Sequence, residues 1–266
     1  MISPRQAFED NMRPAELLLR MYRLLECDTI STDGELVKTL RTAINAQEDE
    51  ELMLIHNEVF LGLVRERANI PMHSLKRAAL NNLLRQSLVT ACTALDTYLP
   101  ALLRANLPTV IQARGRDFIP PDKELQSYFK DLKFDLSDTL RLLGDPDAHL
   151  YIANKVLGFM SFKYLSSKKG IQTVGNLLAL HNPWELISTK LVRDKQDLMR
   201  IIEETATRRN DIVHRADRSS VNPGGDIQDI SYSFSRQSVD TIMHVSFALD
   251  ELVVDKMAQL QAVTAS

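Results

Sequence analysis

The segment from Arg208 to Arg218 holds the residues of this chain best suited to chemistry on a phosphate group. It reads Arg-Arg-Asn-Asp-Ile-Val-His-Arg-Ala-Asp-Arg. Histidine exchanges a proton near neutral pH, so His214 is a candidate general acid or base. Arginine binds a phosphate through two hydrogen bonds and stabilises developing charge, which makes Arg209 a candidate phosphate ligand. Asn210 could orient His214 or a phosphate oxygen.

These groups suit cleavage of an RNA phosphodiester by its own 2′-hydroxyl, which needs proton transfer and charge stabilisation but no metal ion. The six histidines are scattered along the chain, and no His-x3-His pair or carboxylate cluster has the spacing of metal ligands. We therefore expect neither a metal nor a cofactor. Cys27 and Cys92 lie far apart within helical patterns and are interpreted as small buried apolar residues.

A helix over residues 194–214, capped by Asp194 or Asp197, would carry the candidate site. Arg209 falls in the middle of its apolar face. A guanidinium there must meet a carboxylate or carbonyl, or line a cleft, and Asp96 is a conceivable partner for a structural salt bridge. The apolar face consists of Leu198, Ile201, Ile202, Thr205, Ile212 and Val213.

Asn210 and His214 are four residues apart and share a second, more polar face of this helix. Arg209 and His214 differ by about 140° in direction and about 7.5 Å in rise on an ideal helix. One copy of the chain therefore does not aim both groups at one phosphate. A distorted helix end would bring them together, and so would a second copy related by a two-fold axis.

The elements around this helix are predicted to be helical, and the fold class to be all-α. Residues 1–72 are expected to form an N-terminal helical segment, with helices over 5–26 and about 35–68, and a break of the second helix near residue 46 is the alternative. Residues 73–262 form a helical domain that opens with a long amphipathic helix from Ser74, ending at Pro100 or in the turn after it. Its other expected elements are helices over 122–143, 147–166, 171–180, 194–214 and 236–261, one starting at Asn182-Pro183-Trp184, and a short extended piece at 230–234.

Charge is unevenly distributed along the chain. Residues 1–60 hold 6 Lys and Arg against 12 Asp and Glu, a net charge of −6, whereas the chain as a whole carries −3. A site for a polyanion is therefore expected in the later part of the chain. The cluster Glu48-Asp49-Glu50-Glu51 is interpreted as a solvated helix face. The N-terminus lacks the apolar stretch of a signal peptide, and no run is long enough to span a membrane, so a cytoplasmic location is expected.

The string from Arg209 to His214 resembles the R-x4-6-H motif of the HEPN superfamily, in the form where a polar residue follows the arginine. The motif ends a long helix, Arg215 follows the histidine, and a further amphipathic helix comes after the loop. Residues 88–99 are similar to the opening helix of the subgroup called RiboL-PSP-HEPN. The resemblance covers roughly residues 75–260 and implies a helical bundle that dimerises through its motif helices. It also implies metal-independent endoribonuclease activity, in a defence, toxin or RNA-processing setting.

Three hypotheses follow. The first is a homodimeric ribonuclease in which Arg209, Asn210 and His214 of both subunits form one cleft. Its further candidate RNA contacts are Arg208, Arg215 and Arg218, for which a solvated surface is the alternative. The second is a non-catalytic HEPN module that binds RNA, a nucleotide or a partner protein. The third is a structural bundle whose acidic N-terminal arm regulates a protein partner. The intact arginine, asparagine and histidine set favours the first.

Overall fold

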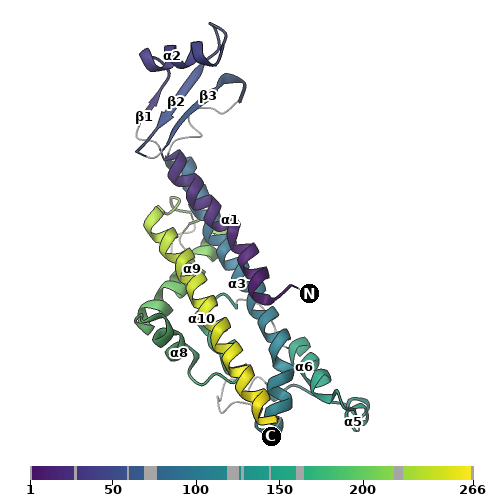
Figure 1. Ribbon diagram of the computed structural model, residues 1–266. Helices are drawn as coiled ribbons and strands as arrows, with labels where there is room; N and C mark the ends of the chain where they lie inside the picture. The colour runs from purple at the N-terminus through teal and green to yellow at the C-terminus, as the bar shows by residue number, and fades with distance from the viewer. Residues whose placement is uncertain are drawn as a thin grey trace.

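Three long helices run side by side through the centre of the protein (Figure 1). They are α1 (Pro4–Leu25), α3 (Arg77–Arg114) and α10 (Tyr232–Thr264). The computed structural model describes residues 2–26, 29–58, 60–68, 77–118, 126, 129–143, 145–159, 165–218 and 224–264.

Helix α1 belongs to the main core of the protein. Its buried residues, Phe8, Met12, Ala15, Leu19 and Tyr22, recur every three or four positions, so they form one stripe along the helix. This stripe packs on α3 and α10, and the predicted helix over 5–26 is confirmed. Only the later part of the predicted N-terminal segment stands apart from this core.

Helix α3 continues through two prolines, so the prediction that it ends at Pro100 is wrong. Proline removes a hydrogen bond and costs roughly 3 kcal/mol inside a helix. Beyond Pro100 the helix buries Leu102, Leu103, Leu107, Val110 and Ile111 against the core. Burial of five such side chains, at roughly 1.5–3 kcal/mol each for a large aliphatic residue, outweighs the cost of Pro100 and Pro108.

Shorter helices cover α3 and α10 and carry the candidate site. They are α6 (Ala148–Phe159), α7 (Lys168–Leu177), α8 (Pro183–Leu191) and α9 (Lys195–Arg215). The expected helix starting at Asn182-Pro183 is α8. The expected helix over 147–166 ends at residue 159, and residues 160–164 lie outside the described part.

Helix α10 begins earlier than expected. The alternating apolar residues at 230–234 predicted an extended piece, but Tyr232 already lies in the helix. Its ring stacks on Tyr22 of α1 with centroids 6.0 Å apart. The extended prediction is wrong from residue 232 onward, because these rings pack against the helical core instead of a neighbouring strand.

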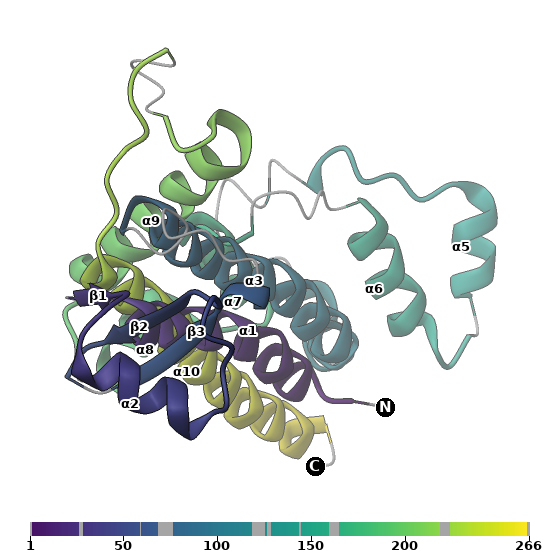
Figure 2. The same cartoon turned by 90° about the horizontal axis from the view of Figure 1, so that it is seen from above.

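An arm formed by α6 and a short helix, α5 (Leu136–Leu142), projects from the side of α3 (Figure 2). Asp135 and Asp138 make a capping box that starts α5. The helix predicted over 122–143 is therefore wrong at residues 130–135, which are not helical. Residues 119–125 and 127–128 lie outside the described part.

A small lobe sits at one end of the α1–α3 pair (Figure 1). It contains β1 (Thr29–Ser31), α2 (Glu35–Ala43), β2 (Leu52–His56) and β3 (Leu61–Arg65), and the antiparallel strands lie in the order β1-β2-β3. The helix predicted over 35–68 is thus wrong beyond residue 43. The apolar run 52–55 forms a strand, because alternate residues of β2 pack on α2 around Val37.

The acidic cluster lies between α2 and β2 rather than on a helix. Glu50 is only 9% exposed, and Arg65 of β3 approaches its carboxylate to 2.6 Å. Arg41 Nη2 also donates to the backbone carbonyl of Glu50, over 2.7 Å. The interpretation of this cluster as a helix face is therefore wrong for all four residues, and its expected exposure to solvent is wrong for Glu50, which ties the end of β3 to the chain before β2.

The expected all-α class holds for the bundle, with the three-stranded lobe as an addition. Within the described ranges, no helix has the length and apolar character needed to cross a membrane.

Candidate functional site

Helix α9 is fixed at its start and along its buried face. The side chain of Asp194 accepts a hydrogen bond from the backbone N–H of Asp197 over 2.8 Å, which confirms the predicted cap. Leu198, Ile201 and Ile202 are buried. The hydroxyl of Thr205 donates to the carbonyl of Ile201, and it lies 2.8 Å from the hydroxyl of Ser238 on α10. The first part of α9, which precedes the candidate residues, is thus held in place by its cap and its buried face.

The helix ends directly after the motif. Ala216 and Asp217 have positive φ angles of 49° and 63°, the left-handed conformation that ends many helices. The backbone N–H of Asp217 donates to the carbonyl of Asp211, six residues earlier, over 2.9 Å. His214 therefore lies in the last turn of α9.

A buried ion-pair network holds the chain just after this turn. The Asp217 side chain is 2% exposed, and it lies 2.5 Å from Arg85 Nε and 2.7 Å from Arg208 Nε. Both arginines also donate to the backbone carbonyl of Gln228, over 2.9 Å and 3.0 Å. This geometry favours a structural role for Arg208 over the predicted contact with RNA, because its two Nη groups already donate to Asp217 and to residues 228–229.

Arg209 makes the ion pair with Asp96 that the sequence offered as an alternative. Its Nη2 lies 2.5 Å from Asp96 Oδ2, and the two side chains are 18% and 21% exposed. Asp96 Oδ1 accepts a hydrogen bond from the backbone N–H of Ser166 over 2.8 Å. The Nη1 group of Arg209 donates to Asn210 Oδ1 over 2.9 Å. The guanidinium is therefore oriented on two sides while part of it still reaches the surface.

Cys92 lies one turn before Asp96 on α3, close enough to the ion pair for both of its charges to act on the thiol. Burial raises the pKa of the Cys92 thiol to about 12, and the nearby charges of Arg209 and Asp96 act on it in opposite directions. Cys92 is 1% exposed, in line with its interpretation as a small buried apolar residue. Cys27 lies outside the described residues.

His214 faces solvent. It is exposed, and it makes no hydrogen bond or ion pair within the part of the chain that the structure describes. Val213 beside it is 50% exposed, so its predicted place on the buried face is wrong. The structure thus brings Arg209 and Asn210 into direct contact and leaves His214 free on the next turn.

The other two predicted RNA contacts are partly engaged. Arg215 Nη1 lies 2.6 Å from Asp211 Oδ1, with the arginine side chain 42% exposed. Arg218 Nε donates to the backbone carbonyl of Gly225 over 2.9 Å. Both lie close to His214 in the chain. Among the described residues, no group of three potential metal ligands occurs near them or elsewhere.

Three residues that hold the site were not singled out in the sequence. Arg85 lies among buried residues of α3, and a cation on an apolar face must be paired, so this signal was available. Asp217 and Ser166 carry no such signal, because one acts from a turn and the other through its backbone N–H.

No protein-family model, curated protein or solved structure matches this chain.

Proposed function

We propose that this protein is a metal-independent endoribonuclease of the HEPN type that acts as a homodimer. One observation carries the proposal. On the last turns of α9, a partly exposed arginine is oriented by neighbours on two sides, while a histidine one turn further is exposed and its side chain has no hydrogen bond or ion pair with any described residue. These are the two groups that phosphodiester cleavage by a 2′-hydroxyl requires.

The proposed reaction assigns a role to each residue. His214 accepts the proton of the 2′-hydroxyl, and the oxygen attacks the adjacent phosphorus to form a 2′,3′-cyclic phosphate. The 5′-oxygen of the next nucleotide leaves and takes a proton from water, and His214 then returns its proton to the solvent. Arg209 binds the non-bridging oxygens and stabilises their added charge. Asn210 holds the guanidinium of Arg209 in its orientation.

The need for a second copy comes from the direction of the side chains. Arg209 points toward Asp96 on α3, whereas His214 is exposed on the last turn of α9. A single chain therefore does not present both groups to one phosphate. A two-fold axis near the end of α9 would set the arginine of one copy beside the histidine of the other.

A non-catalytic binding module is the second candidate, and a specific observation favours it. Asp96 lies 2.5 Å from Arg209 and offsets its charge. A phosphate would have to share the guanidinium with this carboxylate. Because guanidinium has five N–H donors, sharing is geometrically feasible, but the phosphate would bind more weakly than to an unpaired arginine.

The test is cleavage of a mixed RNA pool by purified protein in EDTA. The proposal expects wild type to cut, and His214→Ala and Arg209→Ala to lose about 10²-fold or more of the rate. His244→Ala and Arg200→Ala are matched controls, because His244 is an exposed histidine on α10 and Arg200 is an exposed arginine on α9 itself. Both controls should cut like wild type.

Mixing the two inactive variants tests the composite cleft. A mixed dimer keeps one Arg209 and one His214, so partial recovery of cleavage would require groups from two copies. Light scattering gives the oligomeric state of each sample. A wild-type protein that is folded and dimeric but inert in EDTA would overturn the enzyme proposal and favour the binding module.

A further inference from the structure

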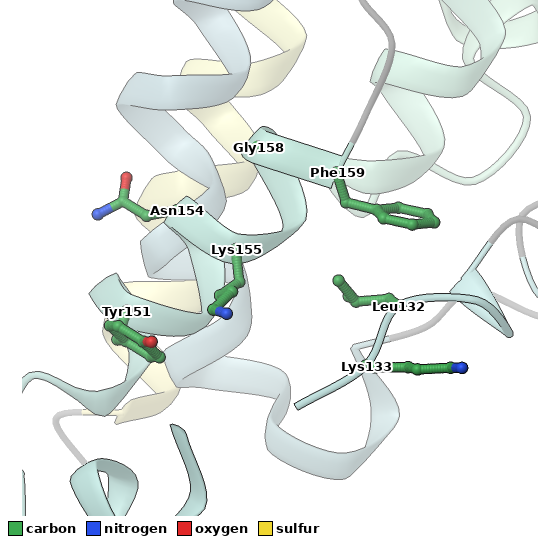
Figure 3. A pocket seen from close by; sticks show the side chains of 7 residues that line it. All are labelled: Leu132, Lys133, Tyr151, Asn154, Lys155, Gly158 and Phe159. Atoms are coloured by element: carbon green, nitrogen blue, oxygen red, sulfur yellow. The ribbon is translucent and has the colours of Figure 1, made fainter. Parts of the chain in front are cut away.

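The arm contains an open pocket of about 440 Å³ that the motif does not use. It lies between α6 and the segment just before α5, and Figure 3 shows it from close by. Sites for small molecules are commonly roughly 300–1,000 Å³ in size. In Figures 1 and 2, α6 and α9 lie on different sides of α3, so this pocket is separate from the end of α9.

Gly158 opens the pocket. It is the next-to-last residue of α6, and an added Cβ atom would meet no atom of the described residues within 4 Å. Its φ angle is not positive, so the backbone does not require glycine there. Glycine in a helix costs roughly 0.5–1 kcal/mol relative to alanine. Because Gly158 has no side chain, the surface of α6 at this position is left open to the pocket.

One wall of the pocket is held firmly in place. The hydroxyl of Tyr151 donates to Asp138, and Lys155 Nζ lies 2.9 Å from the same carboxylate. The guanidinium carbon of Arg141 lies over the Tyr151 ring, 4.5 Å from its centroid. Asp138 is 7% exposed in its side chain. The ring of Tyr151 and the stem of Lys155 are thus fixed before any ligand arrives.

The opposite wall is apolar and carries an uncompensated charge. Leu132 and Phe159 lie near each other on the side of the pocket away from Tyr151 (Figure 3), and Phe159 is 37% exposed. Lys133 is exposed and makes no hydrogen bond or ion pair among the described residues. The charge of Lys155 is offset by Asp138, so the lining keeps one net positive charge above a largely carbon surface.

We propose that this pocket binds a small organic anion with a flat aromatic body, carrying a phosphate or a carboxylate. The ring lies between Leu132 and Phe159, and the acid group pairs with Lys133. A cationic ligand is disfavoured because both charged groups in the lining are positive. A neutral apolar ligand would leave the lysine unused. Mononucleotides and aromatic carboxylic acids are two sources of this chemistry.

Calorimetric titration of the full chain tests the proposal with two probes, adenosine 5′-monophosphate and indole-3-acetate. We expect saturable binding of at least one probe at a single site, and the probe that binds identifies the acid group. If neither probe shows saturable binding at concentrations up to about 10 mM, the proposal is overturned.

Two variants locate the binding. Gly158→Leu fills the open space and should weaken binding at least about tenfold, without lowering helix stability because leucine is the better helix former. Lys133→Gln should weaken it by roughly fivefold, since it removes one exposed charge pair. Lys130→Gln is the matched control, because Lys130 is an exposed lysine three residues earlier and outside the lining. Binding that is equal in wild type and in both lining variants would place the ligand elsewhere and refute the proposal.

Discussion

At the scale of single residues, the ion pair between Arg209 and Asp96 decides how the motif is presented. Its side chains are 18% and 21% exposed, so water screens the pair only in part. Asp96 also accepts the backbone N–H of Ser166. One carboxylate therefore ties α9 and the start of the α7 region to α3, and it keeps the guanidinium from moving freely.

Replacing Asp96 by Asn tests this role. The amide oxygen can still accept the Ser166 N–H, but the charge beside Arg209 is lost. We expect the free energy of unfolding in urea to fall by about 1–3 kcal/mol, the usual cost of leaving a half-buried charged donor without its partner. Under the proposed function, RNA cleavage should fall as well, because Arg209 is no longer held in one orientation.

The matched control is Glu204→Gln, which breaks the pair of Glu204 with Arg200 on the same helix. Those side chains are 47% and 54% exposed, and such surface pairs contribute about 0–1 kcal/mol. Equal stability losses for Asp96→Asn and Glu204→Gln would show that the Arg209 pair is no more than a surface contact.

The sequence anticipated part of this site. A guanidinium on the apolar face of a helix had to find a carboxylate, and Asp96 was the candidate on the long helix. The engagement of Arg208 was not foreseen, because its partner Asp217 reaches it only through the left-handed turn after α9. Residue spacing carries no signal for such a turn when alanine rather than glycine occupies it.

At the scale of elements, helices with capping residues were predictable and the mixed lobe was not. Asp194 and Pro183 each mark the start of a helix that the structure contains. Helix α3 continues past Pro100, because burying its later apolar residues in the core stabilises the helix by more than proline destabilises it. Residues 52–65 read as helix because their apolar residues come in runs, which do not distinguish a buried strand from a buried helix.

The α5–α6 arm provides a prediction about pH. The pKa of Asp138 is lowered from 3.8 to about 2, first by the hydrogen bond from Tyr151 and then by Lys155. A lowered folded-state pKa means that the ionised carboxylate stabilises the arm fully above pH 3.8, and that this contribution is lost as the pH falls toward 2. The arm should therefore keep its structure through mildly acidic pH.

Carbon-detected NMR of the Asp138 carboxyl group measures this pKa directly. Replacing Tyr151 by Phe removes the largest cause, so the pKa should rise toward 3.8 and the arm should loosen at a higher pH. An unchanged pKa in Tyr151→Phe would contradict the assigned cause and leave the ion pair with Lys155 as the source of the shift.

At the scale of the whole molecule, the residues that the structure describes form two hydrophobic cores of different size. The large one joins α1, α3 and α6–α10, and the small one lies in the lobe around Val37, Leu52 and Leu54. A side-chain link joins lobe and bundle where Asn57 Nδ2 donates to the carbonyls of Arg23 and Glu26 at the end of α1, over 3.1 Å and 3.0 Å. Such an arrangement favours local opening of the lobe before the bundle unfolds.

Two leucine truncations separate the cores. Leu54 is 4% exposed in the lobe and Leu99 is 0% exposed in the bundle, and each change to alanine should cost about 2–5 kcal/mol within its own core. In native-state hydrogen exchange, Leu54→Ala should speed exchange in β2 and β3 and leave the amides of α3 and α10 unchanged. Leu99→Ala should speed exchange throughout the bundle. If Leu54→Ala accelerated α3 and α10 as much as the strands, lobe and bundle would unfold as one unit, and changes in the lobe would then be transmitted to the Arg209 site on α9.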